Sequence, residues 1–293
     1  MLRFVPLFLA VTLLIVFTSP YLLADDLATD KFAGHRTGET RNDNGLKLTL
    51  VWCPPGRFKM GSPLHEPGKH PDEGQVEVNL TRGFWLGKTE VTQGQWTAMM
   101  KTSPWEGEAY VEDGDDYPAT FVDWTQCHEF CKKFTEQERK AGRLPLTWRY
   151  DLPTEAQWEY ACRAGTSTRF SFGDNQEDLY EYAWYGGLTQ DGNARFEKYA
   201  HKVGLKKPNN FGLHDMHGNV YEWCRGWYGR KYVGGDDPPG ERKGTLYPSR
   251  GGAWDRQGPY CRSADRECNA PDDLGSVQGF RISCIPDVPD LKD

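Results

Sequence analysis

The alternation of apolar and polar positions predicts a strand near the start of the folded part. Leucine or tryptophan occupies every second position from Leu46 to Trp52, which is the period of a strand with one buried face. Phe58 and Met60 continue this alternation after a Pro-Pro-Gly turn signal. We therefore expect the second segment to pair with the first as a hairpin.

Three segments carry the start signal of a helix. Thr92, Asp123 and Thr154 are each followed three residues later by a glutamine, as in a capping box. Gly165 supplies a stop signal for the third helix. Behind the second and third signals, apolar residues recur at three- and four-residue steps, at Trp124, Cys127, Cys131, Phe134, Trp158, Ala161 and Cys162. These stripes predict helices that pack on the core.

Loops dominate the second half of the chain. Residues 165–249 show weak periodicity and many glycine, proline, asparagine and aspartate residues, and their aromatic content favours ordered loops. The last predicted strand is 280–284, followed by an acidic tail at 287–293.

The N-terminus has the pattern of an export signal. Arg3 precedes an apolar run, and Ala24 stands before two aspartates, so residues 1–24 are predicted to be a signal peptide. The polar residues 25–45 are expected to be a linker, with the domain starting at Leu46. The protein is then exported, to a periplasmic, secreted or cell-surface location. An uncleaved anchor is the alternative, and no later segment has the length and apolarity of a membrane span.

Charge and composition narrow the classes of binding partner and of fold. Removing residues 1–24 removes Arg3 and no acid, so the balance of the mature chain is 34 − 42 = −8. Without a dense basic cluster, this charge excludes nucleic acid and favours a peptide, glycan or protein partner. The 39 aromatic residues (11 Trp, 14 Tyr, 14 Phe) and 32 glycines indicate an irregular, turn-rich fold. Eight cysteines in an exported chain predict disulfides.

The segment 209–223 carries the most distinctive chemistry. Gly212 and Gly218 allow a tightly shaped loop, and Asp215, Asn219 and Glu222 place oxygen atoms close together. Such oxygen sets suit calcium. His214 and His217, in the same loop, have no third ligand at a fixed spacing, so we interpret them as hydrogen-bonding residues rather than transition-metal ligands.

Six blocks in order resemble the formylglycine-generating enzyme family, also called sulfatase-modifying factor domains. They are residues 56–62, 89–96, 152–163, 209–223, 250–252 and 279–281. The resemblance implies one α+β domain of the C-type-lectin-like type over residues 46–286, with low regular secondary structure and long ordered loops. It also implies a groove for an extended peptide or protein partner, with a sulfatase as the candidate.

Members of that family hold copper with a cysteine pair and convert a sulfatase cysteine to formylglycine. The matching segment departs from this pattern, because Ala253 replaces a serine and Arg256 replaces the first cysteine. Copper(I) prefers two facing thiolates, which leaves Cys261 as the candidate catalytic residue, with Cys268 as its potential partner. A disulfide or two buried thiols is the alternative for these cysteines.

The resemblance also implies a calcium site and disulfides. The family's calcium ligands match Asp215, Gly218, Val220 and Glu222. A second family site would use Asn193 and Ala194 together with an acidic stretch further on, and that stretch is missing between Tyr199 and Pro208. A family disulfide joins the second helix to the last strand, which suggests a Cys131–Cys284 bond. For a second family disulfide, Cys162 would need Cys261 or Cys268, because its partner position holds Ser263.

Three functions follow. The first is an exported, calcium-stabilised family member without the copper pair, which binds a peptide or protein or has diverged. The second is a copper-dependent formylglycine-generating oxidoreductase with a rearranged site. The third is a recognition module for glycans or proteins at the cell surface. Because chemistry depends on the residues of the site rather than on the fold, the first is favoured.

Overall fold

A computed structural model describes residues 30–188, 194–195 and 197–287. The chain divides into two units, Met1–Lys31 and Phe32–Asp293. Only Asp30 and Lys31 of the first unit are described, so the predicted signal peptide 1–24 lies outside the described residues. The same holds for residues 288–293 of the predicted tail and for Asn193.

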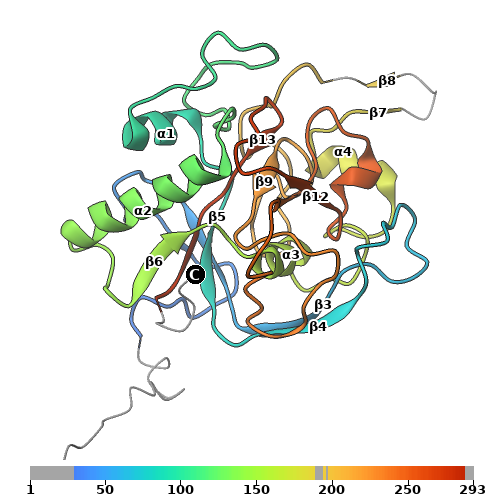
Figure 1. Cartoon of the computed structure of the whole chain (residues 1–293), viewed down its shortest axis with the longest axis horizontal. Coiled ribbons are helices and arrows are strands. Elements are labelled where there is room, and N and C mark those ends of the chain that lie inside the picture. Colours follow the sequence, from blue (N-terminus) through green and yellow to red (C-terminus); the bar gives the residue numbers. More distant parts are fainter. Residues whose placement is uncertain (1–29, 189–193, 196, 288–293) are drawn as a thin grey trace, which may run out of the picture. The chain divides into compact units, whose positions relative to one another are not determined.

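A five-stranded sheet forms the centre of the second unit (Figure 1). Its strands, in spatial order, are β1 (Thr40–Arg41), β2 (Leu50–Cys53), β5 (Phe84–Gly87), β14 (Ser283–Pro286) and β6 (Trp148–Asp151). Apolar side chains cover both of its faces. On β2, Leu50 and Trp52 belong to one core cluster, while Val51 and Cys53 belong to the other. The prediction of a strand with a single buried face was therefore wrong, because the sheet is an inner layer.

Helices cover the two faces. The first core cluster packs the sheet against α1 (Gln93–Met100) and α2 (Trp124–Lys140), and the second packs it against α3 (Glu155–Arg163). Each helix begins with a complete capping box, at Thr92, Asp123 and Thr154, so the three predicted starts are confirmed. The third helix ends as expected, at Ala164 and Gly165, which both adopt left-handed conformations.

The predicted hairpin was wrong in its pairing. Strand β3 (Gly56–Met60) pairs with β4 (Val76–Leu80) in a three-stranded sheet completed by β10 (Gly235–Asp236). Both edges of β2 are already occupied, by β1 and β5, so no hydrogen-bonding edge remains for β3.

A four-stranded sheet carries the motifs of the C-terminal half, with the order β12 (Arg266–Asn269), β11 (Tyr247–Arg250), β9 (Tyr221–Trp223) and β13 (Gln278–Gly279). The predicted strand 280–284 overlaps β14 only at Ser283 and Cys284, because residues 280–282 connect β13 of this sheet to β14 of the central sheet. Short elements complete the described chain: Gln176–Asp178, α4 (Leu179–Tyr182), β7 (Gly187–Leu188), β8 (Ala194–Arg195) and the turn Gly258–Cys261. The mixed α and β architecture with long ordered loops confirms the predicted fold class.

The compact unit begins earlier than predicted. Phe32 is part of the core, and β1 pairs with β2, so residues 32–45 pack with the domain instead of linking to it. At the other end, Asp287 forms ion pairs with Arg139 and Arg149. No helix in the described ranges is long and apolar enough to cross a membrane.

Candidate functional site

The loop 209–223 folds back tightly through left-handed residues. Gly212, Asp215, Gly218 and Asn219 all have positive φ, which is uncommon for residues with a side chain. A Cβ on Gly218 would lie 2.2 Å from the carbonyl oxygen of Trp184, so only glycine fits there. This backbone turns the side chains of Asp215 and Asn219 into the protein interior.

These side chains meet Glu90, which precedes α1. Asn219 donates its side-chain N–H to Glu90 Oε1 (3.0 Å), and Asp215 Oδ2 accepts from the backbone N–H of Gly204 (2.6 Å). The remaining oxygens, Glu90 Oε2 and Asp215 Oδ1, are buried without a hydrogen-bond partner. Together with Glu222 and Arg281, these residues form what we call the carboxylate cluster.

Glu222 is engaged differently. Its carboxylate accepts from Arg281 Nε (2.5 Å) and Nη2 (2.6 Å), and Trp158 Nε1 donates to Oε2 at 2.7 Å. Glu222 and Arg281 are both fully buried. This bidentate ion pair joins β9 to the chain after β13, so it ties the C-terminal segment to the four-stranded sheet.

The carboxylate cluster has more negative than positive charge. Burial raises the pKa of Glu90 well above its usual range, and the neighbouring Asp215 raises it further. Burial also raises the pKa of Asp215 to about 6. Because Arg281 is matched to Glu222, Glu90 and Asp215 are left without a counter-ion, and their ionised forms need a proton or a cation.

The unpartnered oxygens decide how well calcium fits here. Calcium requires several oxygen ligands with unoccupied lone pairs, and Glu90 Oε2 and Asp215 Oδ1 meet this requirement. The donors from Arg281 and Trp158 already occupy most of the acceptor capacity of Glu222. The residues therefore fit a cation at Glu90 and Asp215 better than one at Glu222.

The segment that matches the family's copper site carries different side chains in this protein. Arg256 is about half exposed and lies 3.5 Å from Asp255. Cys261 is fully buried and packs with Phe170, Leu179 and Ala183. Burial raises the pKa of the Cys261 thiol, which disfavours the thiolate that binds metals.

Cys268 lies in other surroundings than Cys261 and is partly exposed. It lies on β12 opposite Pro248, whereas Cys261 belongs to a separate apolar cluster. Gly252 explains the close packing around Cys261, because a Cβ there would lie 2.7 Å from the sulfur. This set of one buried thiol and one guanidinium does not fit copper(I), which requires two facing thiolates.

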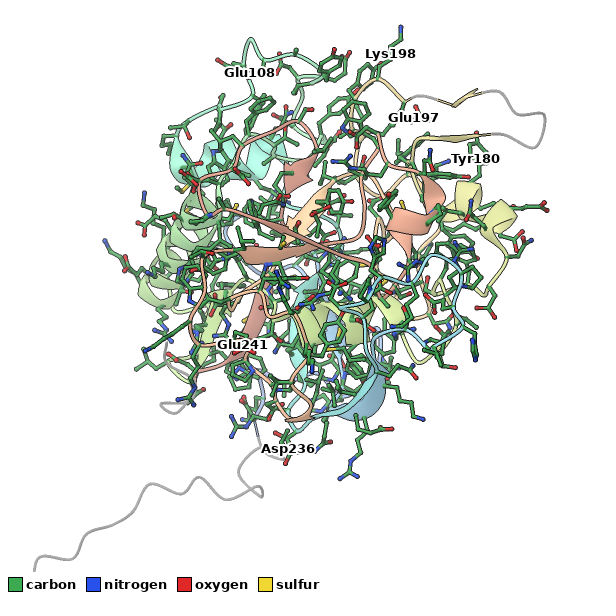
Figure 2. All side chains as sticks on the ribbon, turned by 45° about the vertical axis from the view of Figure 1, so that its right-hand side comes forward. Glu108, Tyr180, Glu197, Lys198, Asp236 and Glu241 are labelled. Carbon is green, nitrogen blue, oxygen red and sulfur yellow. The ribbon has the colours of Figure 1, made fainter. Side chains whose placement is uncertain are left out.

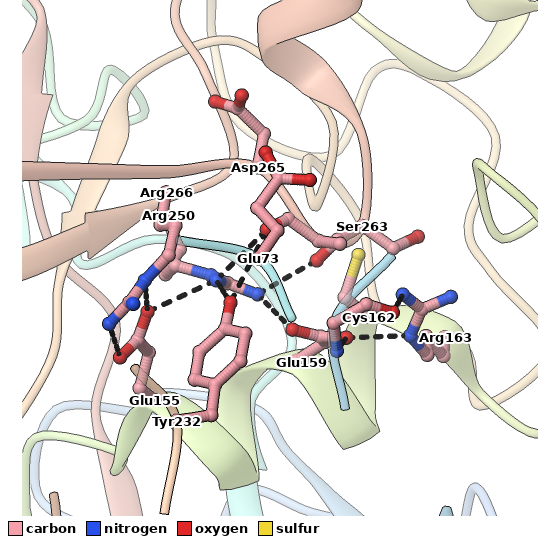
Figure 3. Close-up of polar contacts among 12 residues, drawn as sticks. Glu73, Glu155, Glu159, Cys162, Arg163, Tyr232, Arg250, Ser263, Asp265 and Arg266 are labelled. Atoms are coloured by element: carbon pink, nitrogen blue, oxygen red, sulfur yellow. Dashed lines mark hydrogen bonds and ion pairs between the residues drawn. The ribbon is translucent and has the colours of Figure 1, made fainter. Parts of the chain in front are cut away.

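The arginine of the Arg-Gly-Gly block is structural. Figure 3 shows Arg250 between Glu155, Glu159 and Tyr232, with Arg266 on the other side of Glu155. Burial favours the neutral acid at Glu159, but Arg163 and Arg250 hold the pKa of this carboxyl below its usual value. The block therefore ties β11 to α3 rather than forming a reactive centre.

His70, Glu73 and Asp265 also bring potential metal ligands together. A cation is already present, because Arg262 Nη2 lies 2.7 Å from Glu73 and 3.1 Å from Asp265. The buried guanidinium occupies the position that a metal would need, so we exclude this cluster as a metal site.

The two loop histidines are hydrogen-bonded, as predicted. His214 Nδ1 lies 2.8 Å from the Lys206 carbonyl oxygen. His217 Nε2 accepts from the Ser171 backbone N–H, so Nδ1 carries the proton and donates to the Cys261 carbonyl at 2.8 Å. Burial lowers the pKa of His217 to about 4, which keeps the ring neutral.

All eight cysteines carry thiols rather than disulfides in the structure. Cys131 and Cys284 lie in the same core cluster, so the bond between them stays a prediction. Cys162 contacts the Met216 carbonyl and lies about equally far from both ring nitrogens of His217 (4.0 and 3.9 Å).

A shallow surface recess lies beside Trp254, and its empty volume of about 170 Å³ includes open solvent; its walls come from Gln93, Tyr110, Tyr117, Thr120 and Ser276. We call it the Tyr110 recess. Tyr110 is 69% exposed, and its ring lies 6.3 Å from that of Trp254. Thr120 Oγ1 is buried without a hydrogen-bond partner. Figure 2 labels Glu108, which stands on the same loop at the edge of the molecule.

Comparison with known proteins shows strong similarity over most of the chain. Residues 38–284 match the model of the sulfatase-modifying factor enzyme 1-like domain. The chaperone protein LppX of Paenibacillus barcinonensis is 31% identical, covering 76% of this chain and 84% of that protein. The formylglycine-generating enzyme of Thermomonospora curvata is 24% identical, covering 84% and 96%. The solved structure of PvdO from Pseudomonas aeruginosa has a TM-score of 0.72 at 28% identity, covering 86% and 99%.

Sequence reasoning missed Glu90 as part of the site. The signal in the sequence was that Glu90 directly precedes Val91 and the helix cap Thr92, and the structure shows that Val91 is buried. An acid in a buried segment needs a partner or a ligand.

Proposed function

Because the chain belongs to the formylglycine-generating enzyme family, we propose that it is a divergent member that binds a peptide or protein segment instead of oxidising it with copper. The observation that carries this proposal is the replacement of the copper pair by an exposed guanidinium, Arg256, and a buried thiol, Cys261. A guanidinium is not a ligand for copper(I), and one buried thiol cannot replace the two facing thiolates that this ion requires. The name of the relative LppX, a chaperone protein, supports a binding role.

The direct test is an aldehyde assay. The purified protein is incubated with copper(I), oxygen and a sulfatase-type peptide that contains cysteine, and the peptide is analysed by mass spectrometry. We expect no aldehyde, whereas the Thermomonospora curvata enzyme serves as the positive control. Aldehyde formation that disappears in Cys261→Ser would overturn the proposal in favour of a formylglycine-generating oxidase with a rearranged site.

The Tyr110 recess is the proposed binding surface. The exposed ring of Tyr110 offers stacking area for an extended segment, and Thr120 Oγ1 offers an unused hydrogen-bonding group in the recess. The same peptide, labelled with a fluorophore, reports binding through fluorescence anisotropy. Tyr110→Ala should weaken binding about fivefold, whereas Leu146→Ala, which also removes an exposed side chain, should leave it unchanged. Equal affinities of the two variants would exclude this surface.

We further propose that calcium binds at Asp215 and Glu90, with main-chain oxygens of Gly218 and Val220 as additional ligands. The unpartnered carboxylate oxygens support this assignment. A bound divalent cation would supply the positive charge that the carboxylate cluster lacks. It would also join the loop 209–223 to the segment before α1, and so stabilise the fold rather than take part in a reaction.

Export also remains a proposal, and it rests on residues 1–24. Mass spectrometry of the N-terminus of the protein recovered from a bacterial periplasm or culture medium tests it. We expect a mature chain beginning at Asp25. A protein that retains Met1 in the cytoplasm would exclude the signal peptide.

A further inference from the structure

A second recess lies where β4 and β14 end, beside the start of α3. Its empty volume is about 450 Å³, part of it open to solvent, and Arg82, Gln157 and Arg225 line it together with the apolar Leu80 and Ile285. We call it the Arg225 recess. Asp237 also lines it, next to Asp236, which Figure 2 labels at the lower edge of the molecule.

Arg225 has fewer partners than a buried guanidinium requires. Its side chain is 6% exposed, and Nη1 donates to Asp151 Oδ2 at 3.1 Å. Nε is buried with no hydrogen-bond partner. A buried donor of a charged group that lacks a partner lowers the stability of the fold. An acceptor on a ligand would remove this cost, because the described chain does not provide one for Nε.

Asp151 compensates the charge of Arg225 only in part. Arg149 contacts the same Oδ2 through Nε and Nη2, both at 3.3 Å, and Asp151 Oδ1 accepts from the Leu152 backbone N–H. Arg149 also pairs with Asp287, as Arg139 does, so three guanidinium groups share the two carboxylates of Asp151 and Asp287. One positive charge of this network is therefore not compensated, and Arg225 carries positive charge at the recess.

The other groups around the recess also favour an anion. Within the described ranges, no hydrogen bond or ion pair holds the Arg82 guanidinium. Gln157 uses its oxygen to accept from Thr154, which leaves the amide N–H groups as donors. The positive end of the α3 dipole adds to this field. Asp237 adds one negative charge to the lining, and Thr81 donates to both of its oxygens; the charges of Arg82 and Arg225 outnumber it.

We propose that the Arg225 recess binds the oxyanion group, carboxylate or phosphate, of a small molecule. Arg225 and Arg82 supply charged donors, Gln157 supplies a neutral donor, and Leu80 and Ile285 contact the apolar body of the ligand. None of these residues belongs to the Tyr110 recess, the carboxylate cluster or the copper position. The proposal therefore stands or fails independently of the proposed function.

Isothermal titration calorimetry with sodium phosphate and with sodium succinate tests this site, at constant ionic strength in chloride. We expect saturable binding of at least one anion by the full domain. Arg82→Gln and Arg225→Gln should each weaken that binding about tenfold or more, as expected for loss of a charge-assisted hydrogen bond. Arg230→Gln is the matched control, because it removes an exposed arginine that does not line the recess, and it should bind as the wild type does.

The titrations with the two anions identify the class of ligand. Binding of phosphate alone identifies a phosphate-bearing ligand, and binding of succinate alone identifies a carboxylate. The proposal is overturned if neither anion binds saturably, or if Arg82→Gln binds as tightly as the wild type. Because Arg82 is only partly buried, this variant decides the question even if Arg225→Gln does not fold.

Discussion

At the residue scale, Gly252 shows how one position fixes the surroundings of Cys261. Its φ of +78° disfavours a side chain, and a Cβ would lie 2.7 Å from the cysteine sulfur and from the Tyr260 carbonyl oxygen. We predict that Gly252→Ala lowers the free energy of unfolding by about 2–4 kcal/mol, through backbone strain and overpacking. Urea denaturation measures this change.

Gly107→Ala is the matched control. Gly107 also has a left-handed backbone (φ +81°), but a Cβ at this position would have no other atom within 4 Å. The Gly107→Ala variant should therefore lose only about 1 kcal/mol of the free energy of unfolding, from backbone strain alone. If both variants lose the same amount, the contact with Cys261 contributes nothing.

His217 gives a pH dependence at the same scale. Burial lowers its pKa to about 4, whereas the unfolded chain has a histidine pKa of about 6.5. Between these values the unfolded state binds a proton that the folded state does not. The contribution of the neutral His217 ring to the free energy of unfolding is therefore complete above pH 6.5. This contribution falls by about 3 kcal/mol as the pH drops to 4.

Other groups titrate in this window, so the measurement compares variants. The free energy of unfolding of the wild type and of His217→Gln is followed from pH 7 to pH 4. We expect the difference between the two proteins to shrink or change sign as the pH falls. A difference that stays constant from pH 7 to pH 4 would contradict the assignment.

At the element scale, the helix starts are the most local features of the fold. Asp123 accepts from the Gln126 backbone N–H at 2.7 Å, and Gln126 reaches back to the Asp123 N–H. Asp123→Ala should lower the free energy of unfolding by about 1 kcal/mol, because it leaves a first-turn N–H without its cap. Asp123→Asn should retain most of the stability, and a loss as large as that of alanine would show that capping is not the cause.

At the scale of the whole molecule, calcium should join segments that are distant in sequence. A calcium concentration about 100 times its Kd would stabilise the fold by about 2.7 kcal/mol, which corresponds to a rise in Tm of about 5–10 °C. Differential scanning calorimetry with calcium and with a chelator measures it. Glu90→Gln and Asp215→Asn should abolish the response, while the exposed Glu108→Gln should keep it.

Glu222→Gln distinguishes an ion-pair partner from a metal ligand. It leaves the buried Arg281 without its charge partner, so we expect a loss of about 3–5 kcal/mol with or without calcium. A variant that is stable in chelator but no longer responds to calcium would instead show that Glu222 is a principal ligand.

Features that depend on neighbouring residues could be predicted from the sequence. The capping boxes, the stripe of α2 and the shaped loop 209–223 each depend on side chains within a few positions, and the structure confirms them. The order of six motif blocks identified the family. The resemblance also indicated Asp215, whose carboxylate lies in the carboxylate cluster.

Only the tertiary structure decided which distant groups meet. The partners of β2, the pairing of Glu222 with Arg281, the approach of Glu90 to Asp215 and the incomplete coordination of Arg225 all join segments far apart in sequence. Local periodicity cannot specify them, because strand pairing and buried charge pairing depend on which edges and donors other segments have already occupied. The sequence alone determined the local elements and the family, and packing determined the charges that remain available for ligands.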